Sequence, residues 1–158
     1  MVPEKSNIVP SEFIIVGGTG NLSKSKILPA LFWRFLDNQI DAQSNIILCD
    51  KYIKSKKDFF LELQSNCNKA IKSEDNNLEN WNNFIKIIKL VELDVVSGNG
   101  HLDLVKIIKE KFDENRPIIF YLAIASSLFG NSCKFIRDSG INVPQSRLVI
   151  EKPIGKNK

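Results

Sequence analysis

Cysteine and histidine are scarce in this sequence. Its 158 residues contain three cysteines, Cys49, Cys67 and Cys133, which are odd in number and far apart. That pattern fits neither a disulfide framework nor a paired zinc motif, and free thiols indicate a reducing compartment. The one histidine, His101, follows a glycine-rich turn and is expected to be an ordinary surface residue. We therefore expect neither a metal site nor a catalytic residue in this chain.

Long apolar runs and a strong excess of one charge are also missing. No apolar stretch approaches the ~20 residues that cross a bilayer, and residues 1–11 lack the apolar core of a signal peptide. The 22 basic residues exceed the 18 acidic ones by a formal charge of +4, and the lysines are scattered. A membrane anchor and a nucleic-acid-binding stripe are thus not indicated, whereas an anionic small molecule suits this charge. The expected location is the cytoplasm.

What is present is the composition of one globular domain, with 43% hydrophobic and 25% charged residues. We expect residues 1–11 to be an N-terminal extension and residues 12–158 to form the domain. Short β-branched and aromatic runs predict buried strands at residues 12–16, 45–49, 88–93, 117–123 and 145–150.

Apolar residues three and four positions apart predict the helices between these strands, at residues 21–35, 56–71, 102–112 and 127–139. Pro29 lies inside the first helical pattern and predicts a break or kink there. The polar, Asn-rich stretch 73–83 is expected to be an exposed loop. Continuous apolar strands that alternate with helices indicate an α/β fold, a doubly wound, Rossmann-like parallel sheet covered on both faces.

The strongest local signal is the glycine-rich turn of residues 16–23, Val-Gly-Gly-Thr-Gly-Asn-Leu-Ser, between the first strand and the first helix. Glycine allows a sharp turn and close approach of the backbone to a diphosphate, and the first amides of the helix point at the anion. Gly18 and Gly20 keep the G-x-G spacing of dinucleotide-binding turns, with Ser23 at the third small position. The sequence therefore predicts a dinucleotide site.

The end of the second strand carries residues of both charges, Asp50 followed by Lys51. In this architecture an acid there binds the ribose 2′-hydroxyl of NAD, and a base binds the 2′-phosphate of NADP. Asp50 argues for NAD. Lys51, with more lysines in the following loop, argues for NADP, and the sequence leaves both open.

Three segments in order resemble glucose-6-phosphate dehydrogenases. Residues 13–31 resemble the family's G-A-S/T-G-D-L-A-x-x-K-L-x-P-A-L opening, and residues 119–123 resemble its F-Y-L-A strand. Residues 147–156, Arg-Leu-Val-Ile-Glu-Lys-Pro-Ile-Gly-Lys, resemble its R-x-V-x-E-K-P-F-G-R/K segment. The resemblance implies a coenzyme domain that uses NADP, with NAD not excluded. It implies oxidation of glucose 6-phosphate to 6-phosphogluconolactone, in the pentose phosphate pathway, by the complete enzyme.

Carried over residue by residue, the resemblance implies coenzyme contacts at the glycine turn and at the ends of later strands. Lys51 matches an arginine that binds the 2′-phosphate, Asp94 and Val95 match a pair beside the adenine, and Lys152 would reach both coenzyme and sugar phosphate. The contacts implied in the turn itself are Gly17, Gly18, Thr19, Gly20, Asn21 and Leu22.

The family's substrate motif, R-I-D-H-Y-L-G-K, is not found in these residues. The resemblance therefore implies that the C-terminal substrate and catalytic domain is absent, and that this chain alone is inactive. Glucose 6-phosphate would bind only when the missing domain is supplied, for example by a complementing C-terminal chain. Two alternatives stay open at this point, a non-catalytic NAD(P)-binding sensor and a degenerate gene remnant.

Overall fold

The computed structural model describes residues 8–111, 113, 115–141 and 144–151. Within them the chain forms the strands β1 (Glu12–Val16), β2 (Asn45–Asp50), β3 (Ile88–Glu92), β4 (Ile118–Leu122) and β5 (Arg147–Ile150). The helices are α1 (Leu28–Leu36), α2 (Lys56–Ala70), α3 (Leu78–Lys86), α4 (His101–Glu110) and α5 (Phe129–Ser139). A π-helical segment, η1 (Ser23–Ile27), precedes α1, and a 3-10 turn, η2 (Ser126–Leu128), precedes α5.

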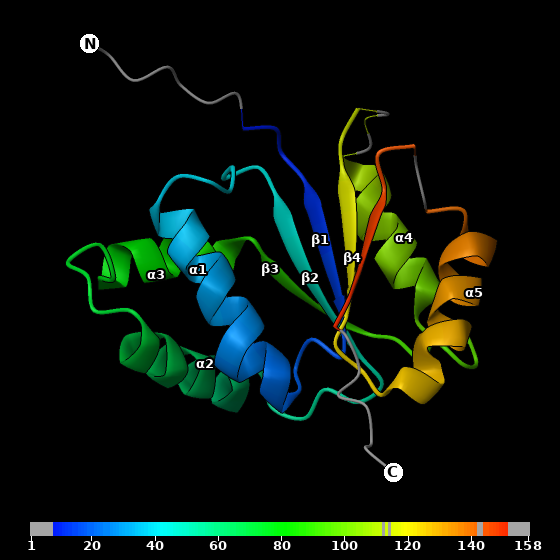
Figure 1. Cartoon of the computed structure of the whole chain (residues 1–158), viewed down its shortest axis with the longest axis horizontal. Helices are drawn as coiled ribbons and strands as arrows, with labels where there is room; N and C mark the ends of the chain where they lie inside the picture. Colours follow the sequence, from blue (N-terminus) through cyan, green and yellow to red (C-terminus); the bar gives the residue numbers. More distant parts are fainter. Residues whose placement is uncertain (1–7, 112, 114, 142–143, 152–158) are drawn as a thin grey trace.

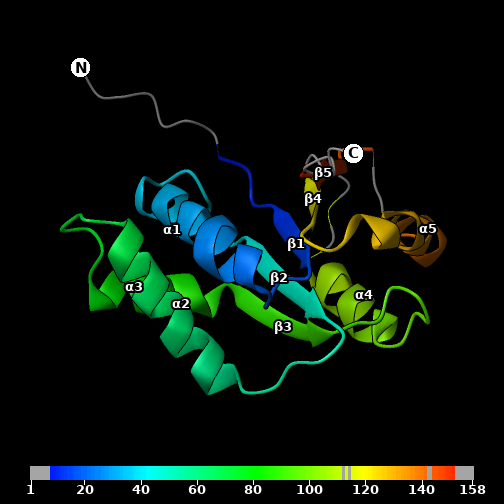
Figure 2. The ribbon, with the colours of Figure 1, turned by 60° about the horizontal axis from the view of Figure 1, so that its bottom comes forward.

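All five strands pair in parallel, in the order β3-β2-β1-β4-β5. Figures 1 and 2 show α1, α2 and α3 grouped on one side of this sheet and α4 and α5 on the other. The predicted α/β, doubly wound parallel sheet is thereby confirmed. None of the helices in the described ranges combines the length and the apolar character that a bilayer span requires.

The sheet separates two apolar cores, because neighbouring side chains on a strand point to opposite faces. Ile15 and Leu48 belong to the core under α1, α2 and α3, whereas Ile14 and Cys49 belong to the core under α4 and α5. The cysteines are free thiols, as predicted. Burial raises the pKa of the Cys49 and Cys67 thiols to about 12, so both stay protonated at neutral pH.

The stretch of residues 73–83 is not the exposed loop that its composition predicted, because α3 begins within it. The side chain of Asn77 starts the helix by accepting a hydrogen bond of 2.9 Å from the backbone N–H of Asn80. Asparagine has low intrinsic helix propensity but is among the best N-terminal caps. The same residue type that suggested a loop therefore fixes the start of a helix.

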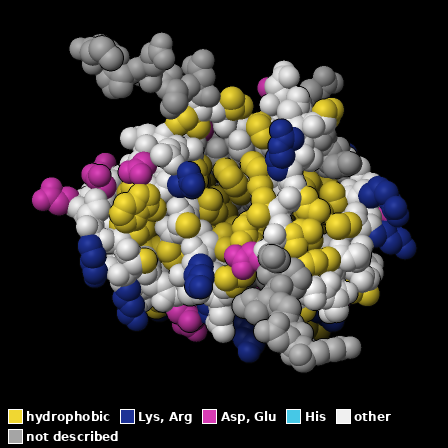
Figure 3. All heavy atoms as spheres, viewed as in Figure 1, with side chains coloured by type: hydrophobic (Ala, Val, Ile, Leu, Met, Phe, Trp, Pro, Cys, Tyr) yellow, Lys and Arg dark blue, Asp and Glu magenta, His cyan; other side chains and the backbone are white. Residues whose placement is uncertain are grey.

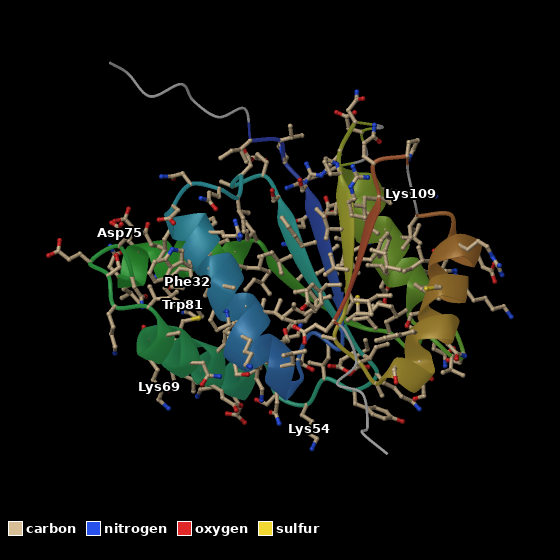
Figure 4. The ribbon with its side chains drawn as sticks, viewed as in Figure 1. Phe32, Lys54, Lys69, Asp75, Trp81 and Lys109 are labelled. Carbon is tan, nitrogen blue, oxygen red and sulfur yellow. The ribbon has the colours of Figure 1, made fainter. Side chains whose placement is uncertain are left out.

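Tertiary packing supplies the rest of the stability of α3. Its buried face carries Trp81 and Phe84, which are 5% and 0% exposed. Their rings lie 5.4 and 4.9 Å, centroid to centroid, from the ring of Phe32 on α1, and Figure 4 shows Phe32 beside Trp81. Such aromatic contacts stabilise the pairing of two helices beyond the area that they bury.

The helix is not broken at Pro29, where a break or kink was predicted; instead the helix type changes one residue earlier, from η1 to α1. The backbone N–H of Leu28 bonds to the carbonyl of Ser23, five residues back, and α1 then begins with Pro29 in its first turn. Proline has no N–H and is tolerated at such a position because the first N–H groups of a helix lack partners anyway. The helical region therefore remains continuous through Pro29.

Strand β5 departs from the expectation that both faces of the sheet are covered. All four of its residues are exposed, and Leu148, Val149 and Ile150 keep 44%, 38% and 41% of their surface accessible. β5 is an edge strand, and the core under the three helices on the α1 side includes side chains of β1, β2 and β3, with Tyr121 of β4 packed against it, but no side chain of β5. The apolar residues of β5 therefore form an exposed surface.

Candidate functional site

The carboxyl ends of the parallel strands meet at one edge of the sheet, the lower edge in Figure 1. At this edge Val16 of β1 lies beside Cys49 of β2 and Leu122 of β4. From β1 the chain moves to β2 and β3 on one side, and it then crosses to β4 on the other side. Open α/β sheets bind ligands in the crevice at such a reversal. The glycine turn follows β1 and so lies at this position.

Gly17 and Gly18 are buried where the turn crosses the neighbouring strands. Gly17 has a φ of 80°, a conformation that favours glycine, and a Cβ there would collide with the carbonyl oxygen of Ala123. A Cβ on Gly18 would lie 2.7 Å from the Cβ of Leu48. Both glycine N–H groups donate to the carbonyl oxygen of Cys49, at 2.8 and 3.2 Å. The turn therefore requires glycine at both positions.

The turn leads directly into the first helix. The N–H of Gly20 donates to the carbonyl of Gly17 at 3.1 Å, and the N–H of Lys24 donates to the carbonyl of Gly20 at 3.0 Å. Asn21 and Leu22 are helical, and within the described part of the chain their N–H groups have no hydrogen-bond acceptor. Unpaired N–H groups and the positive end of the helix dipole make this a suitable place for an anion.

Ser23 occupies the third small position of the turn and is fully buried. Its hydroxyl oxygen has no hydrogen-bond partner among the residues that the structure describes. A small side chain there allows the helix to pack closely on the sheet, which is the role that the third glycine has in dinucleotide-binding turns.

The turn has a partner that sequence reasoning did not foresee. Asp50, the last residue of β2, accepts two hydrogen bonds on Oδ2, from the N–H of Thr19 at 3.1 Å and from its hydroxyl at 2.6 Å. Bonds to an ionised carboxylate are stronger than bonds between neutral groups. Asp50 therefore fixes the conformation of the turn in addition to lying at the expected ribose edge. The two residues are 31 positions apart in the sequence, so no local pattern indicates this contact.

Lys51 and Asp94, predicted as coenzyme contacts, lie at the same edge and face each other. The Lys51 Nζ is 3.7 Å from the Asp94 Oδ2, and it lies 5.6 Å from the centroid of the Tyr52 ring. The N–H of Val96 donates to Asp94, which together with weaker bonds from Ser97 and the nearby Lys51 charge lowers the pKa of the Asp94 carboxyl. Asp94 therefore stays ionised at neutral pH.

Val95 and His101 belong to the segment between β3 and the start of α4. Both line a hollow of about 390 Å³ against α5. The ring Nδ1 of His101 lies 3.2 Å from the carbonyl oxygen of Gly98, and the residue is half-buried. Within the described residues no carboxylate contacts this ring, so no acid orients it as a general base.

The predicted residues of the turn, Lys51, Asp94 and Val95 are thus brought to one edge of the sheet by parallel strand pairing. Lys152 lies outside the described residues. No group of three possible metal ligands occurs in the part of the chain that the structure describes.

Sequence reasoning missed a contact beside an apolar groove on the α1 side of the sheet. The Tyr121 hydroxyl donates to the Glu151 Oε1 at 2.8 Å. Burial, followed by this carboxylate, raises the pKa of Tyr121 to about 12. Figure 3 shows the hydrophobic side chains of this groove in the hollow at the centre of the face, beside α1. Its volume is about 350 Å³, and its lining residues are Phe13, Ile15, Lys26, Ile27, Ala30, Leu31, Ile119, Tyr121 and Glu151.

Comparison with known proteins places this geometry in a family. The family model described as glucose-6-phosphate dehydrogenase, NAD binding domain, matches residues 14–158. The glucose-6-phosphate 1-dehydrogenase of Rhizobium meliloti (strain 1021) is 30% identical over 150 residues, which are 95% of this chain and 30% of the relative. That of Caenorhabditis elegans is 29% identical over 152 residues, covering 92% of this chain and 28% of the relative.

Solved structures share the fold. A glucose-6-phosphate dehydrogenase in complex with its substrate glucose 6-phosphate superposes with a TM-score of 0.78 at 24% identity, over 95% of this chain and 32% of that one. The enzyme from Mycobacterium avium gives 0.75 at 16% identity, over 92% and 30%. This chain thus spans about 30% of the length of its curated relatives.

The family match over residues 14–158 includes the glycine turn, the reversal of strand order and the acidic end of β2. These are the features with which a Rossmann-like sheet binds a dinucleotide coenzyme. The chain belongs to the glucose-6-phosphate dehydrogenase family and corresponds to its NAD-binding domain.

Proposed function

We propose that residues 12–158 are the coenzyme-binding domain of a cytoplasmic glucose-6-phosphate dehydrogenase. In the complete enzyme this domain holds NADP as hydride acceptor while glucose 6-phosphate is oxidised to 6-phosphogluconolactone. The observation that carries the proposal is the glycine turn at the strand reversal. Gly17 and Gly18 have no space for a Cβ, and the N–H groups of Asn21 and Leu22 have no acceptor among the residues that the structure describes. A diphosphate can approach such a backbone and accept those N–H groups.

Lys51 supports NADP as the coenzyme. Its side chain is 60% exposed, and its ion pair with Asp94 is long at 3.7 Å. Exposed ion pairs of this kind stabilise a protein by only ~0–1 kcal/mol. The Lys51 ammonium can therefore turn from Asp94 toward a 2′-phosphate with little loss of stability. On the family resemblance, Lys152 is also a proposed contact with the coenzyme and the sugar phosphate.

NAD is the second candidate, and Asp50 is the observation in its favour. Its carboxylate lies at the end of β2, beside the glycine turn, where an acid binds the ribose hydroxyls of NAD. Because Lys51 favours NADP and Asp50 favours NAD, the affinities for both coenzymes have to be compared in one binding assay.

We further propose that this chain alone completes no turnover. Oxidation at C1 of the sugar transfers a hydride from that carbon to the coenzyme and needs a general base within reach of the hydroxyl proton. In the described residues, His101 contacts a backbone carbonyl and has no carboxylate partner. The chain also spans about 30% of the length of its relatives, so binding of glucose 6-phosphate is assigned to the part that it does not span.

The groove lined by Tyr121 and Glu151 is the proposed contact surface for that part, a complementing C-terminal substrate domain. An all-parallel sheet is normally covered on both faces, and here β5 contributes no side chain to the core under α1, α2 and α3. Glu151 lies at the rim of the groove and directly follows β5. A C-terminal domain connected at this strand would therefore begin beside the surface that needs a cover.

Equilibrium titration of the purified chain with NADP and with NAD tests the coenzyme proposal. We expect saturable one-site binding and a rise in the thermal midpoint with coenzyme, because a ligand of the folded state stabilises it. Gly18→Ala should abolish binding, whereas Gly130→Ala is a matched control, since a Cβ there meets nothing within 4 Å. No saturation by either coenzyme below about 10 mM would refute the proposal.

A mixing experiment tests the proposed contact surface. The C-terminal part of the Rhizobium meliloti relative, produced without its own coenzyme domain, should bind this chain in analytical ultracentrifugation. Val149→Asp, on β5 beside the groove residue Tyr121, should weaken the association, whereas Val96→Asp, which changes an exposed valine away from the groove, should not. Equal association of both variants would contradict the assignment of the groove.

A further inference from the structure

The two edge strands of the sheet differ in how well they are protected against pairing with another chain. β3 carries the exposed charged residues Lys89 and Glu92, and charged side chains on an edge strand discourage such pairing. β5, at the opposite edge, carries Leu148, Val149 and Ile150 in a row, all of them exposed. Figure 2 shows β5 as the last strand beyond β4, its one paired neighbour among the described residues. The outer edge of β5 therefore offers backbone N–H and C=O groups to a further strand.

The charges around β5 form a symmetric pattern. Residues 147–151 read Arg-Leu-Val-Ile-Glu, with opposite charges two positions before and two positions after Val149. Alternate residues of a strand point to the same face, so Arg147, Val149 and Glu151 share a face. Two contacts identify it as the face of Tyr121. Val149 is the partner of Tyr121 in the sheet, and the Glu151 carboxylate accepts the Tyr121 hydroxyl at 2.8 Å.

This pattern is complementary to itself when two β5 strands run antiparallel. About a two-fold axis at Val149, Leu148 faces Ile150 of the second copy, and Arg147 faces Glu151 of the second copy. Side chains directly opposite each other in such a pair have Cβ atoms about 4.5–5.5 Å apart, and opposite charges there stabilise the pairing whereas like charges destabilise it. A parallel arrangement in register would instead place each charge beside its own kind. The charges therefore favour the antiparallel register centred on Val149.

We propose that the outer edge of β5 is a self-association surface, through which two copies of this chain form a two-fold symmetric, antiparallel strand pair centred on Val149. The symmetry forms the contact between Arg147 and Glu151 twice. Glu151 can make this contact while it is bound to Tyr121, because that bond uses Oε1 and the carboxylate has a second oxygen. The pairing lies in the plane of the sheet, whereas the groove beside Tyr121 lies on its face. It requires no coenzyme and is thus independent of the proposed function.

Sedimentation of the complete chain tests the association itself. The contact involves four strand residues from each copy, and small interfaces of this kind form weak complexes. In analytical ultracentrifugation we expect a monomer at about 10 µM and a monomer–dimer equilibrium with a dissociation constant on the order of 0.1–1 mM. A chain that stays monomeric up to about 1 mM would overturn the proposal. Coenzyme binding by such a monomer would leave the proposed function intact.

A charge exchange tests the register. Arg147→Glu places like charges opposite each other at both ends of the strand pair, and Glu151→Arg does the same with the other sign. Each single variant should raise the dissociation constant of the dimer at least about tenfold, and the double variant, which restores opposite charges, should return it to within about threefold of the wild-type value. Arg34→Glu is the matched control, because it makes the same charge change at an exposed arginine on α1, and it should leave the association unchanged. No recovery in the double variant would refute the register.

A disulfide experiment tests the same register without changing a charge. Cys133, an exposed cysteine, is first replaced by serine. In that background Val149→Cys places two thiols opposite each other at the axis, and mild oxidation should link the two copies. Leu148→Cys is the control, because its two copies lie diagonally about 7–8 Å apart, beyond the reach of a disulfide, and should remain largely unlinked. Equal linking of both variants would contradict the pairing.

Circular dichroism melts first check that every variant folds. If a charge variant does not fold, the comparison of Val149→Cys with Leu148→Cys decides the register.

Discussion

Replacement of Arg116 by alanine should destabilise the fold far more than the loss of an ordinary ion pair. Arg116 Nε donates to the Glu12 Oε1 at 2.8 Å, at the start of β1, and the Glu12 side chain is 1% exposed. Asn45 also donates to this oxygen, at 3.1 Å, whereas Oε2 has no partner among the described residues. Without the guanidinium a buried carboxylate remains uncompensated, which reduces the free energy of unfolding by about 3–5 kcal/mol.

Combining Arg116→Ala with Glu12→Gln shows whether the buried charge of Glu12 causes the loss of stability. Glu12→Gln removes that charge and keeps an acceptor, and charge removal on both sides of a buried pair is often close to neutral. We therefore expect Arg116→Ala to reduce stability by less than about 1.5 kcal/mol in the Glu12→Gln background. Urea titrations followed by circular dichroism give the free energies and the slopes that check two-state unfolding. An equal effect of Arg116→Ala in both backgrounds would refute the reasoning.

The pH dependence follows from the same site. Burial raises the pKa of the Glu12 carboxyl above its ordinary value of 4.5, while Arg116 and Asn45 lower it in part. The folded state thus holds this proton more tightly than the unfolded state does. The stabilising contribution is complete below pH 4.5 and is lost as the pH rises through the raised pKa. Since Arg116→Ala removes a cause that lowers the pKa, its destabilisation should grow from pH 4 to pH 8, as measured by urea titration.

Other predictions concern the turn, α3 and the groove. Gly18→Ala should reduce the free energy of unfolding by more than about 1 kcal/mol, because the added Cβ would lie too close to backbone atoms of the neighbouring strands. Urea titration measures this change. Asn77→Ala removes the cap of α3 and should reduce stability by about 1 kcal/mol, whereas Asn82→Ala, exposed within α3, should change it little; thermal melts compare the two. Ultraviolet titration should show Tyr121 ionising at about 12, and Glu151→Gln should lower this pKa; an unchanged midpoint would contradict the contact.

The order of the strands, the helices other than α3, the fold class and the location of the glycine turn could be predicted because each depends on local pattern. Apolar runs, helical spacing and the run of glycines are properties of neighbouring residues. Pro29 predicted a break that does not occur, because the residue lies in the first turn of α1, where proline is tolerated. The loop predicted around Asn77 was wrong, because asparagine is common both in loops and at the starts of helices.

Contacts between residues far apart in the sequence could not be predicted from such local patterns. The bonds of Asp50 with Thr19 and the bond of Tyr121 with Glu151 join residues 31 and 30 positions apart. Each depends on which strands become neighbours and in which register. The same holds for β5, whose apolar run resembles that of a buried strand although its place at the sheet edge leaves it exposed.

The sequence by itself determined that alternating strands and helices form, and that a glycine turn able to meet a diphosphate follows the first strand. Only the tertiary structure decided that the carboxylate of Asp50 binds Thr19 of this turn and that all four residues of β5 stay exposed. The physical reason is that local propensity acts between near neighbours along the chain. Charge environment and burial, in contrast, are set by parallel strand pairing, which brings distant residues together.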